Sequence, residues 1–336
     1  MTKGTKIFRI IISVLLALTM LISAFFAAAM CLHIVRDIMG ESYEINVAGV
    51  EVTRNNCDDI LGDGSVYYDA VNNILVFDNA EIKYDHSVVY SRVDLMINLV
   101  GENKFIMSGD YVPAIHASNY LLSKDLTIFG DGSLSIEFEG TSGDVTGIYA
   151  KDLKIESKVS LELPDCTNIA NGIYSDGSMV LTNGASVTVK GGAGKFCTAV
   201  KTRNNLDIEY NSSLNVSTTP GSADLCRGLT VGGSLVVWDG AGLSVSVDDE
   251  AVKASECISV SGLLRVKDGA SLSAASKKAY AVACYGSIEL NEGASISASC
   301  EAETTDLLCY GALVNYGGRV NAEAEALGGA YDRSEN

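Results

Sequence analysis

The sequence has little proline and little histidine, with 3 of each among 336 residues, and it contains a single tryptophan. Glycine is plentiful at 33 residues, and 47% of the chain is hydrophobic. This much apolar material is enough for a core, which excludes a chain that is disordered throughout. The composition is typical of many short strands separated by glycine turns.

Basic residues are also scarce, at 24 Lys and Arg against 42 Asp and Glu. Four of the basic residues, Lys3, Lys6, Arg9 and Arg36, lie in the first 36 positions, which contain no acidic residue. Residues 37–336 therefore carry 20 basic and 42 acidic residues, a formal charge of −22. Such a surface repels phosphate backbones, so we expect no nucleic-acid partner.

The nine cysteines show no C-x-x-C spacing, so neither a zinc site nor a thioredoxin-type motif is indicated. No metal site and no cofactor are predicted. Cys197 and Cys226 each precede an apolar residue by three positions and are expected to stack. They are interpreted either as buried thiols that fill small core positions or as a disulfide between neighbouring strands.

The N-terminus reads as a targeting or anchoring segment, residues 1–36. Its apolar stretch runs from Ile10 to about Leu32 without a charge and is long enough to cross a bilayer as a helix. The basic residues before it place the N-terminus inside and the body of the chain outside. Ala27-Ala28-Ala29 offers a cleavage site, so removal as a signal peptide is the alternative. Either way we expect an exported protein, on the cell membrane through a single span or secreted.

The clearest pattern is a spacing of eight residues between two aliphatic positions, repeated seven times. The first members of the pairs lie 24 to 29 residues apart, which is the signature of a solenoid. The pairs are Leu126/Leu134, Leu153/Leu161, Met179/Val187, Leu206/Leu214, Leu235/Leu243, Leu264/Leu272 and Ile288/Ile296.

Each repeat carries a third apolar position after the pair, and the strands around all three alternate with period two. These positions are Ile115, Ile148, Ile173, Val200, Leu229, Ile258, Val282 and Leu308. The fold class is therefore an all-β, three-sided parallel β-helix, right-handed by the general rule for parallel crossovers. We assign residues 37–90 to an N-terminal β cap with a hairpin near Ala48-Gly49, 91–325 to the β-helix and 326–336 to a C-terminal tail.

The corner between the first two strands repeats the sequence Asn/Asp/Glu-Gly-Ala-Ser, as in Asn183-Gly184-Ala185-Ser186. Glycine supplies the positive φ that such a corner needs. If this corner has a fixed length, the outward residues of the second strand stack along one face. That face would consist of Ser135, Glu162, Thr188, Asn215, Ser244, Ser273, Ser297 and Asn321.

The stretch before the repeats resembles a module of Gram-positive, Firmicute-type surface proteins. The resemblance lies in Gly49-Val50-Glu51-Val52-Thr53, residues 60–66 and residues 79–82, and the repeats continue it in Gly147-Ile148-Tyr149. Proteins of this kind are described as carbohydrate-binding-domain-containing and extend into β-helical repeats. The resemblance implies display at the cell surface and glycan binding, but it fixes no ligand site.

Some parallel β-helices degrade polysaccharides, so an enzyme is an alternative for this fold class. Asp58-Asp59 lies in the cap and Asp248-Asp249-Glu250 in a variable corner, and neither has a matching histidine or arginine. The histidines are His33, His86 and His116. No catalytic residue is therefore predicted, and a polysaccharide lyase or hydrolase is the least favoured alternative.

Sugar binding calls for exposed aromatic rings beside hydrogen-bonding groups. Tyr149 and Tyr174 follow the third apolar position in successive repeats and should stack outward, with Lys201 at the same place in the next repeat. Tyr285 and Tyr310 form a second pair, and Trp238 lies beside an Asp-Gly corner. These five aromatic residues are the candidate ligand-binding residues. The alternative interpretation is an aromatic ladder that only stabilises the stack of coils.

The sequence thus predicts an exported, surface-anchored β-helix that serves as a carbohydrate-binding or adhesion module. Its expected partners are glycans or a surface polysaccharide, and the membrane through the N-terminal helix. A purely structural surface or spacer protein is the alternative.

Overall fold

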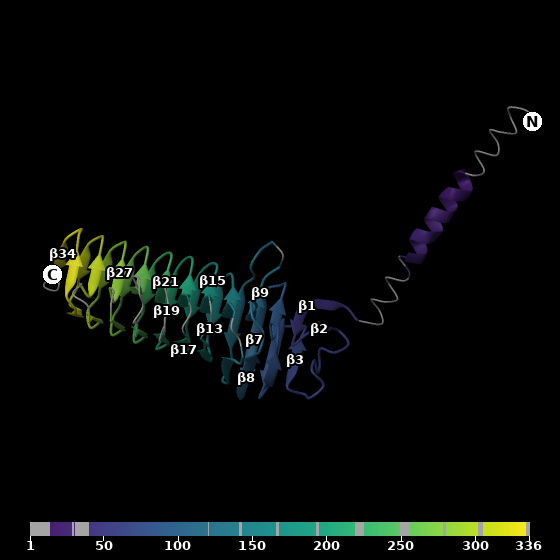
Figure 1. The fold of residues 1–336 in the computed structure, drawn as a ribbon, viewed down its shortest axis with the longest axis horizontal. Coiled ribbons are helices and arrows are strands. Elements are labelled where there is room, and N and C mark those ends of the chain that lie inside the picture. Colours follow the sequence, from purple (N-terminus) through teal and green to yellow (C-terminus); the bar gives the residue numbers. More distant parts are fainter. Residues whose placement is uncertain are drawn as a thin grey trace, which may run out of the picture.

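Short strands with alternating inward and outward side chains build a tube with three faces. In the computed structural model, two sheets have twelve strands and one has ten. Figure 1 shows the coils following one another along a rod from the N-terminal strands to the C-terminus. The structure describes residues 14–28, 30, 40–119, 121–140, 143–165, 168–192, 195–218, 225–248, 256–277, 280–301 and 305–333.

The first sheet, called sheet A, carries the third apolar position of each repeat. Its strands in spatial order are β2 (Val50–Thr53), β1 (Ser42–Val47), β6 (Val89–Ser91), β9 (Pro113–Ala117), β12 (Val145–Ala150), β15 (Ile169–Ser175), β18 (Phe196–Thr202), β21 (Leu225–Val231), β24 (Glu256–Val260), β27 (Val282–Cys284), β30 (Leu307–Cys309) and β33 (Ala324–Ala326).

The second sheet, sheet B, carries the first member of each eight-residue pair. Its strands are β3 (Val66–Asp69), β4 (Ile74–Asp78), β7 (Leu95–Val100), β10 (Leu126–Phe129), β13 (Leu153–Ile155), β16 (Met179–Leu181), β19 (Leu206–Ile208), β22 (Leu235–Val237), β25 (Leu264–Val266), β28 (Ile288–Leu290), β31 (Leu313–Asn315) and β34 (Ala330–Asp332).

The third sheet, sheet C, follows the glycine corner. Its strands in chain order are β5 (Glu81–Tyr84), β8 (Glu102–Met107), β11 (Ser133–Phe138), β14 (Lys158–Glu162), β17 (Ser186–Gly191), β20 (Ser213–Thr218), β23 (Gly242–Val247), β26 (Ser271–Ser276), β29 (Ser295–Cys300) and β32 (Arg319–Asn321).

Pairing between coils is parallel in all three sheets, so the predicted parallel β-solenoid is confirmed. The parallel ladder begins with β4 on β7, at Ile74, inside the stretch that the sequence assigns to the cap. It continues to β34, where Leu313 pairs with Ala330. Before Ile74 the pairing is antiparallel: β1 and β2 form the expected hairpin, which turns through positive φ at Ala48 and Gly49.

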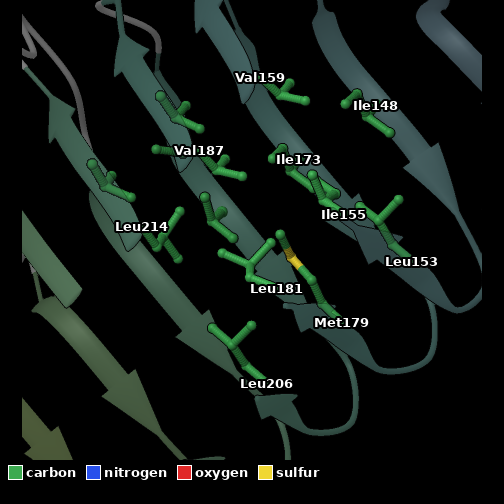
Figure 2. Close-up of a cluster of buried hydrophobic side chains, with 14 of the residues drawn as sticks. Ile148, Leu153, Ile155, Val159, Ile173, Met179, Leu181, Val187, Leu206 and Leu214 are labelled. Atoms are coloured by element: carbon green, nitrogen blue, oxygen red, sulfur yellow. The ribbon is translucent and has the colours of Figure 1, made fainter. Parts of the chain in front are cut away.

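Inward side chains from the three sheets form one continuous core. Figure 2 shows how Leu153, Met179 and Leu206 repeat at the same place in successive coils, each fully or almost fully buried. Each coil buries its apolar face only against its neighbours, so the stability of the rod is the sum of these contacts. The glycine corner behaves as expected, because Gly184, Gly240, Gly269 and Gly293 all have positive φ.

Two register expectations were wrong. Leu161 does not stack on Leu134 but on Ile136, because only residues 156–158 separate β13 from Val159 at the corner, whereas residues 129–133 separate Ile128 from Leu134. Glu162 accordingly stacks on Glu137, and Ser160 takes the place next to Ser135.

The second wrong expectation concerns the last third-position anchor. Leu307, not Leu308, pairs with Val282 and points inward. Leu307 precedes Leu313 by six residues, the same step that separates Val282 from Ile288 in the coil before.

Residues 14–28 form a helix whose apolar side chains, among them Leu21 and Phe25, are exposed. Within the part of the chain that the structure describes, no helix is both long and apolar enough to cross a membrane. The predicted span from Ile10 to Leu32 is therefore not confirmed, and both of its ends lie outside the described residues.

Candidate functional site

Four aromatic side chains occupy one outward register position of sheet A on successive strands. Tyr90 pairs with His116, His116 with Tyr149 and Tyr149 with Tyr174. Their ring centroids lie 5.3, 5.4 and 5.4 Å apart, and each pair meets edge to face. We call these four residues the aromatic ladder. The parallel register causes it, since equivalent residues of neighbouring coils lie about 4.8 Å apart.

Cationic side chains lie at both ends of the aromatic ladder. The guanidinium carbon of Arg92 is 5.7 Å from the ring centroid of Tyr90. At the other end, Lys201 Nζ is 5.0 Å and the guanidinium carbon of Arg203 is 5.9 Å from the ring centroid of Tyr174. These cation–π contacts favour ordered rings at the two ends of the ladder.

A carboxylate ties this end of the ladder to a neighbouring loop. Arg203 Nε lies 2.8 Å from both Tyr174 Oη and Asp176 Oδ1. Asp176 Oδ2 also accepts a hydrogen bond of 3.1 Å from Ser123 Oγ. Burial, followed by the negative charge of Asp176, raises the pKa of Tyr149. The phenol of Tyr149 is therefore neutral at physiological pH and remains a hydrogen-bond donor.

His116 is the only non-tyrosine member of the aromatic ladder. Its Nε2 lies 2.6 Å from Ser118 Oγ, so the hydroxyl donates to this nitrogen when it is deprotonated. Burial lowers the pKa of His116 below its ordinary value of 6.5. The ring is therefore neutral at pH 7 and contributes a face, an edge and a polar atom.

Ser118 begins a loop that is inserted between β9 and β10. Lys124 N–H donates to Ala117 O, so the two ends of the insertion lie next to each other. Ser118 and Ser123 form an antiparallel bridge at the base of the loop, and Asn119 Oδ1 accepts the N–H groups of Leu121 and Leu122. The insertion thus projects from sheet A beside the aromatic ladder.

Two grooves flank the aromatic ladder and share His116. Groove 1, of about 520 Å³, lies toward the N-terminal hairpin and is lined by residues that include Glu44, Tyr84, Tyr90 and Arg92. Groove 2, of about 600 Å³, is lined by residues of the inserted loop and of the strands around Tyr149. They include Tyr111, Ser118, Leu121, Leu122, Ser123, Asp144, Tyr149, Asn171 and Asp176. The site therefore combines aromatic surface with carboxylate, amide and hydroxyl groups.

The structure brings Tyr149 and Tyr174 together, as expected, but places Tyr285 and Tyr310 elsewhere. These two rings stack face to face at the corner after sheet A, 5.0 Å apart and inclined by 13°. Tyr285 Oη donates to Glu256 Oε1 at 3.1 Å. One face of each ring covers the other, and the two side chains remain 48% and 47% exposed.

Trp238 lies at a third place, the corner between sheets B and C. Its Nε1–H donates to Asp207 Oδ1 at 3.0 Å, and Lys267 Nζ lies 3.3 Å from the ring centroid. One face of the indole is thus covered by the lysine of the next coil. The five candidate residues therefore belong to three separate locations, and among them Tyr149 lines groove 2.

Sequence reasoning missed Tyr90 and His116. His116 follows Ile115 as Tyr149 follows Ile148, so the spacing that identified the tyrosines could have identified it. Tyr90 follows Val89 in the same way, but recognising it requires knowing that the coils begin before residue 91. The groove walls, by contrast, come from a loop and a hairpin whose positions no spacing predicts.

The comparisons with known proteins add no assignment. No protein-family model matches the chain, and neither a curated protein nor a solved structure matches it. Among the residues that the structure describes, no group of three or more His, Cys, Asp or Glu side chains is placed to hold a metal ion. The interpretation of the site therefore depends on its own geometry.

Proposed function

We propose that this protein is an exported, surface-displayed β-solenoid that binds carbohydrate along the outer face of sheet A. The observation that carries the proposal is the aromatic ladder with two grooves that follow one another along it. Four rings in a row provide apolar faces, and Asp144, Asn171 and Asp176 provide hydrogen-bonding groups in groove 2. Sites for polar organic ligands combine these two features.

Sugars suit this surface because a pyranose ring has an apolar face of C–H groups and a rim of hydroxyls. The C–H face packs on an aromatic ring, while carboxylate and amide groups accept and donate hydrogen bonds to the rim. An edge-to-face contact occupies the edge of one ring and one face of its partner, so it leaves more ring surface for other contacts than a face-to-face stack does. The half-buried state of the rings supports a fixed platform that loses little entropy on binding.

The N-terminal segment is proposed to anchor the rod in the membrane. The support is the uncharged stretch from Ile10 to Leu32 after three basic residues, together with the exposed apolar side chains of residues 14–28. Exposed apolar surface of this kind is costly in water and is stabilised in lipid. We further propose that the N-terminal hairpins cap the rod and that the solenoid is right-handed.

A structural surface or spacer protein is the competing proposal, and one observation favours it. Edge-to-face ring pairs stabilise the stack of coils whether or not a ligand binds. The same ring contacts are expected under both proposals, so only a binding measurement distinguishes a carbohydrate-binding protein from a structural one.

The test is a glycan array probed with the full chain in detergent, alongside two variants. Tyr149→Ala removes a central ring of the ladder, and Tyr310→Ala removes an aromatic ring of the same kind from the distant corner. Binding that is lost in Tyr149→Ala and kept in Tyr310→Ala supports the proposal. Absence of binding to any glycan, combined with intact cell-to-cell adhesion by cells that display the protein, would favour the structural alternative.

A further inference from the structure

We infer that the ligand is an extended chain of neutral or amino sugars that lies parallel to the rod axis and crosses both grooves. This inference rests on the proposed function and names its substrate class. It follows from three features of the site: the continuity of the grooves, the spacing of the rings and the sign of the charges.

The two grooves form one path because they share a wall residue. His116 lines both, Tyr90 lines groove 1 and Tyr149 lines groove 2. These three residues are in register on β6, β9 and β12, so the path from one groove to the other runs across the strands and along the rod. A ligand that occupies both grooves must therefore extend along the axis of the solenoid.

The spacing of the rings suits a polymer with one sugar per coil. Successive ring centroids of the aromatic ladder are 5.3 to 5.4 Å apart. In an extended β-linked pyranose chain, successive sugar rings repeat at a closely similar distance, so each sugar can contact one aromatic ring. Coiled or highly branched glycans cannot maintain this match over several residues.

The charges in groove 2 disfavour an anionic ligand. Asp144 and Asp176 line it, and its described lining contains no lysine or arginine. A uronate or phosphate group would face the carboxylate of Asp144 and that of Asp176, whose charge Arg203 partly offsets, within a surface that is already strongly negative. A hydroxyl, an amide or an ammonium group, by contrast, donates to a carboxylate.

Groove 1 has mixed charge and does not reverse this preference. Its lining includes Glu44 and Glu51 beside Arg92 and His86, and the guanidinium group of Arg92 lies over the ring of Tyr90. The grooves together therefore select against a polymer with a negative charge on each sugar.

The rim of groove 2 adds an apolar contribution. The side chains of Leu121, Leu122 and Tyr111 line the groove and are 89%, 67% and 74% exposed. Exposed leucines beside a groove favour contact with apolar substituents of a ligand. The methyl group of an acetamido substituent fits this rim, which makes N-acetylated amino sugars suitable members of the class.

The experiment measures the affinity of the full chain for N-acetylated chito-oligosaccharides, from the monosaccharide to the hexasaccharide, with oligogalacturonates of equal length as the anionic comparison. Affinity is expected to rise roughly two- to tenfold with each sugar up to the tetrasaccharide, one for each ring of the ladder, and then to level off. Oligogalacturonates are expected to bind at least about tenfold more weakly.

Two variants locate the ligand. Tyr90→Ala shortens the ladder at one end and Tyr174→Ala at the other, so in each the affinity should stop rising at the trisaccharide. A single cooperative unfolding transition, even if its midpoint is lowered by the lost ring contact, confirms that each variant is folded. The inference is overturned if affinity does not depend on chain length, if oligogalacturonates bind best, or if both variants keep the full length dependence. Binding to other glycans on the array without length dependence overturns only this inference, whereas absence of any glycan binding overturns the proposed function as well.

Discussion

Tyr149 and Tyr174 occupy the same outward position on β12 and β15 and meet edge to face, with ring centroids 5.4 Å apart and ring planes at 71°. This one contact joins two neighbouring coils and lies at one end of the aromatic ladder. Its contribution to folding and its contribution to binding can be separated by mutation.

The contribution to folding is accessible from a double-mutant cycle. Tyr149→Leu and Tyr174→Leu each remove one ring of the pair and keep apolar bulk. We expect a coupling free energy of about 0.5–1.5 kcal/mol in chemical unfolding, which is typical of an aromatic pair. Tyr149→Leu combined with Tyr310→Leu serves as the control, because these rings lie on distant coils and their effects should add. Additive effects for the Tyr149/Tyr174 pair would mean that the two rings do not stabilise each other.

The burial of His116 predicts a stability that falls in mild acid. Its pKa in the folded chain is lower than 6.5, so the unfolded chain binds the proton more readily. The stabilisation is complete above pH 6.5 and decreases as the pH falls from 6.5 toward the folded pKa. Tyr90, Tyr149 and Ser118 contact the ring.

The measurement is the unfolding midpoint as a function of pH, with His116→Gln as the comparison. The charged groups in the shared grooves, Glu44, Arg92, Asp144 and Asp176, remain in both proteins. The variant should therefore lose only the part of the pH dependence that belongs to the histidine. An unperturbed histidine titrates between about pH 5 and 7. Identical pH profiles of the two proteins in this range would contradict the claim that the burial of His116 contributes to the pH dependence of stability.

A buried serine in the glycine corner predicts a stabilising substitution. Ser212 is fully buried, and its hydroxyl has no hydrogen-bond partner among the described residues. The equivalent position in other coils is an alanine: Ala185, Ala241, Ala270 and Ala294. Ser212→Ala should raise the free energy of unfolding by roughly 1 kcal/mol, because it removes an unsatisfied polar group. The reverse change, Ala241→Ser, should lower it by about 1–3 kcal/mol. A destabilised Ser212→Ala variant would show that the hydroxyl has a partner.

Two glycines in strands predict opposite effects of the same substitution. A Cβ atom at Gly172 would overlap Ala199 O, so Gly172→Ala should destabilise the rod by about 1–3 kcal/mol. Gly242 faces outward in β23 between Ser213 and Ser271, and the nearest atom to a new Cβ would be 3.7 Å away. Gly242→Ala should stabilise by about 0.5–1 kcal/mol, since it restricts the unfolded chain. Thermal unfolding of both variants checks the pair of signs, and equal shifts would contradict the packing described here.

Much of the fold is accessible from spacing alone, because a solenoid repeats one physical arrangement. The positions of Leu126, Leu153 and Met179 were correct, since first-strand anchors must stack for the core to be continuous. Arg265 and Glu289 follow the same rule, since they are neighbours on β25 and β28 with Nε and Oε2 2.6 Å apart. Local alternation and coil period together determine such contacts.

The errors arise where a corner changes length. Leu161 was misplaced because the spacing rule assumes a corner of constant length, and the shorter corner puts Val159 at the anchor position. Leu308 was misplaced because Leu307 and Leu308 are adjacent and both lie five or six residues before Leu313. Only part of the candidate site could be predicted, because only part of it belongs to the repeat. The repeat gave Tyr149 and Tyr174, whereas the groove walls come from the inserted loop after Ser118 and the hairpin around Gly49, which belong to no repeat.

The most direct test of the proposed function is a calorimetric titration of the full chain with the tightest-binding glycan from the array. The account predicts that Tyr149→Ala weakens binding at least about tenfold, since it removes a central platform ring together with its two ring contacts. Tyr310→Ala, the matched control, should bind as the unmodified chain does. Equal affinities for all three proteins would contradict the assignment of the aromatic ladder as the carbohydrate-binding site.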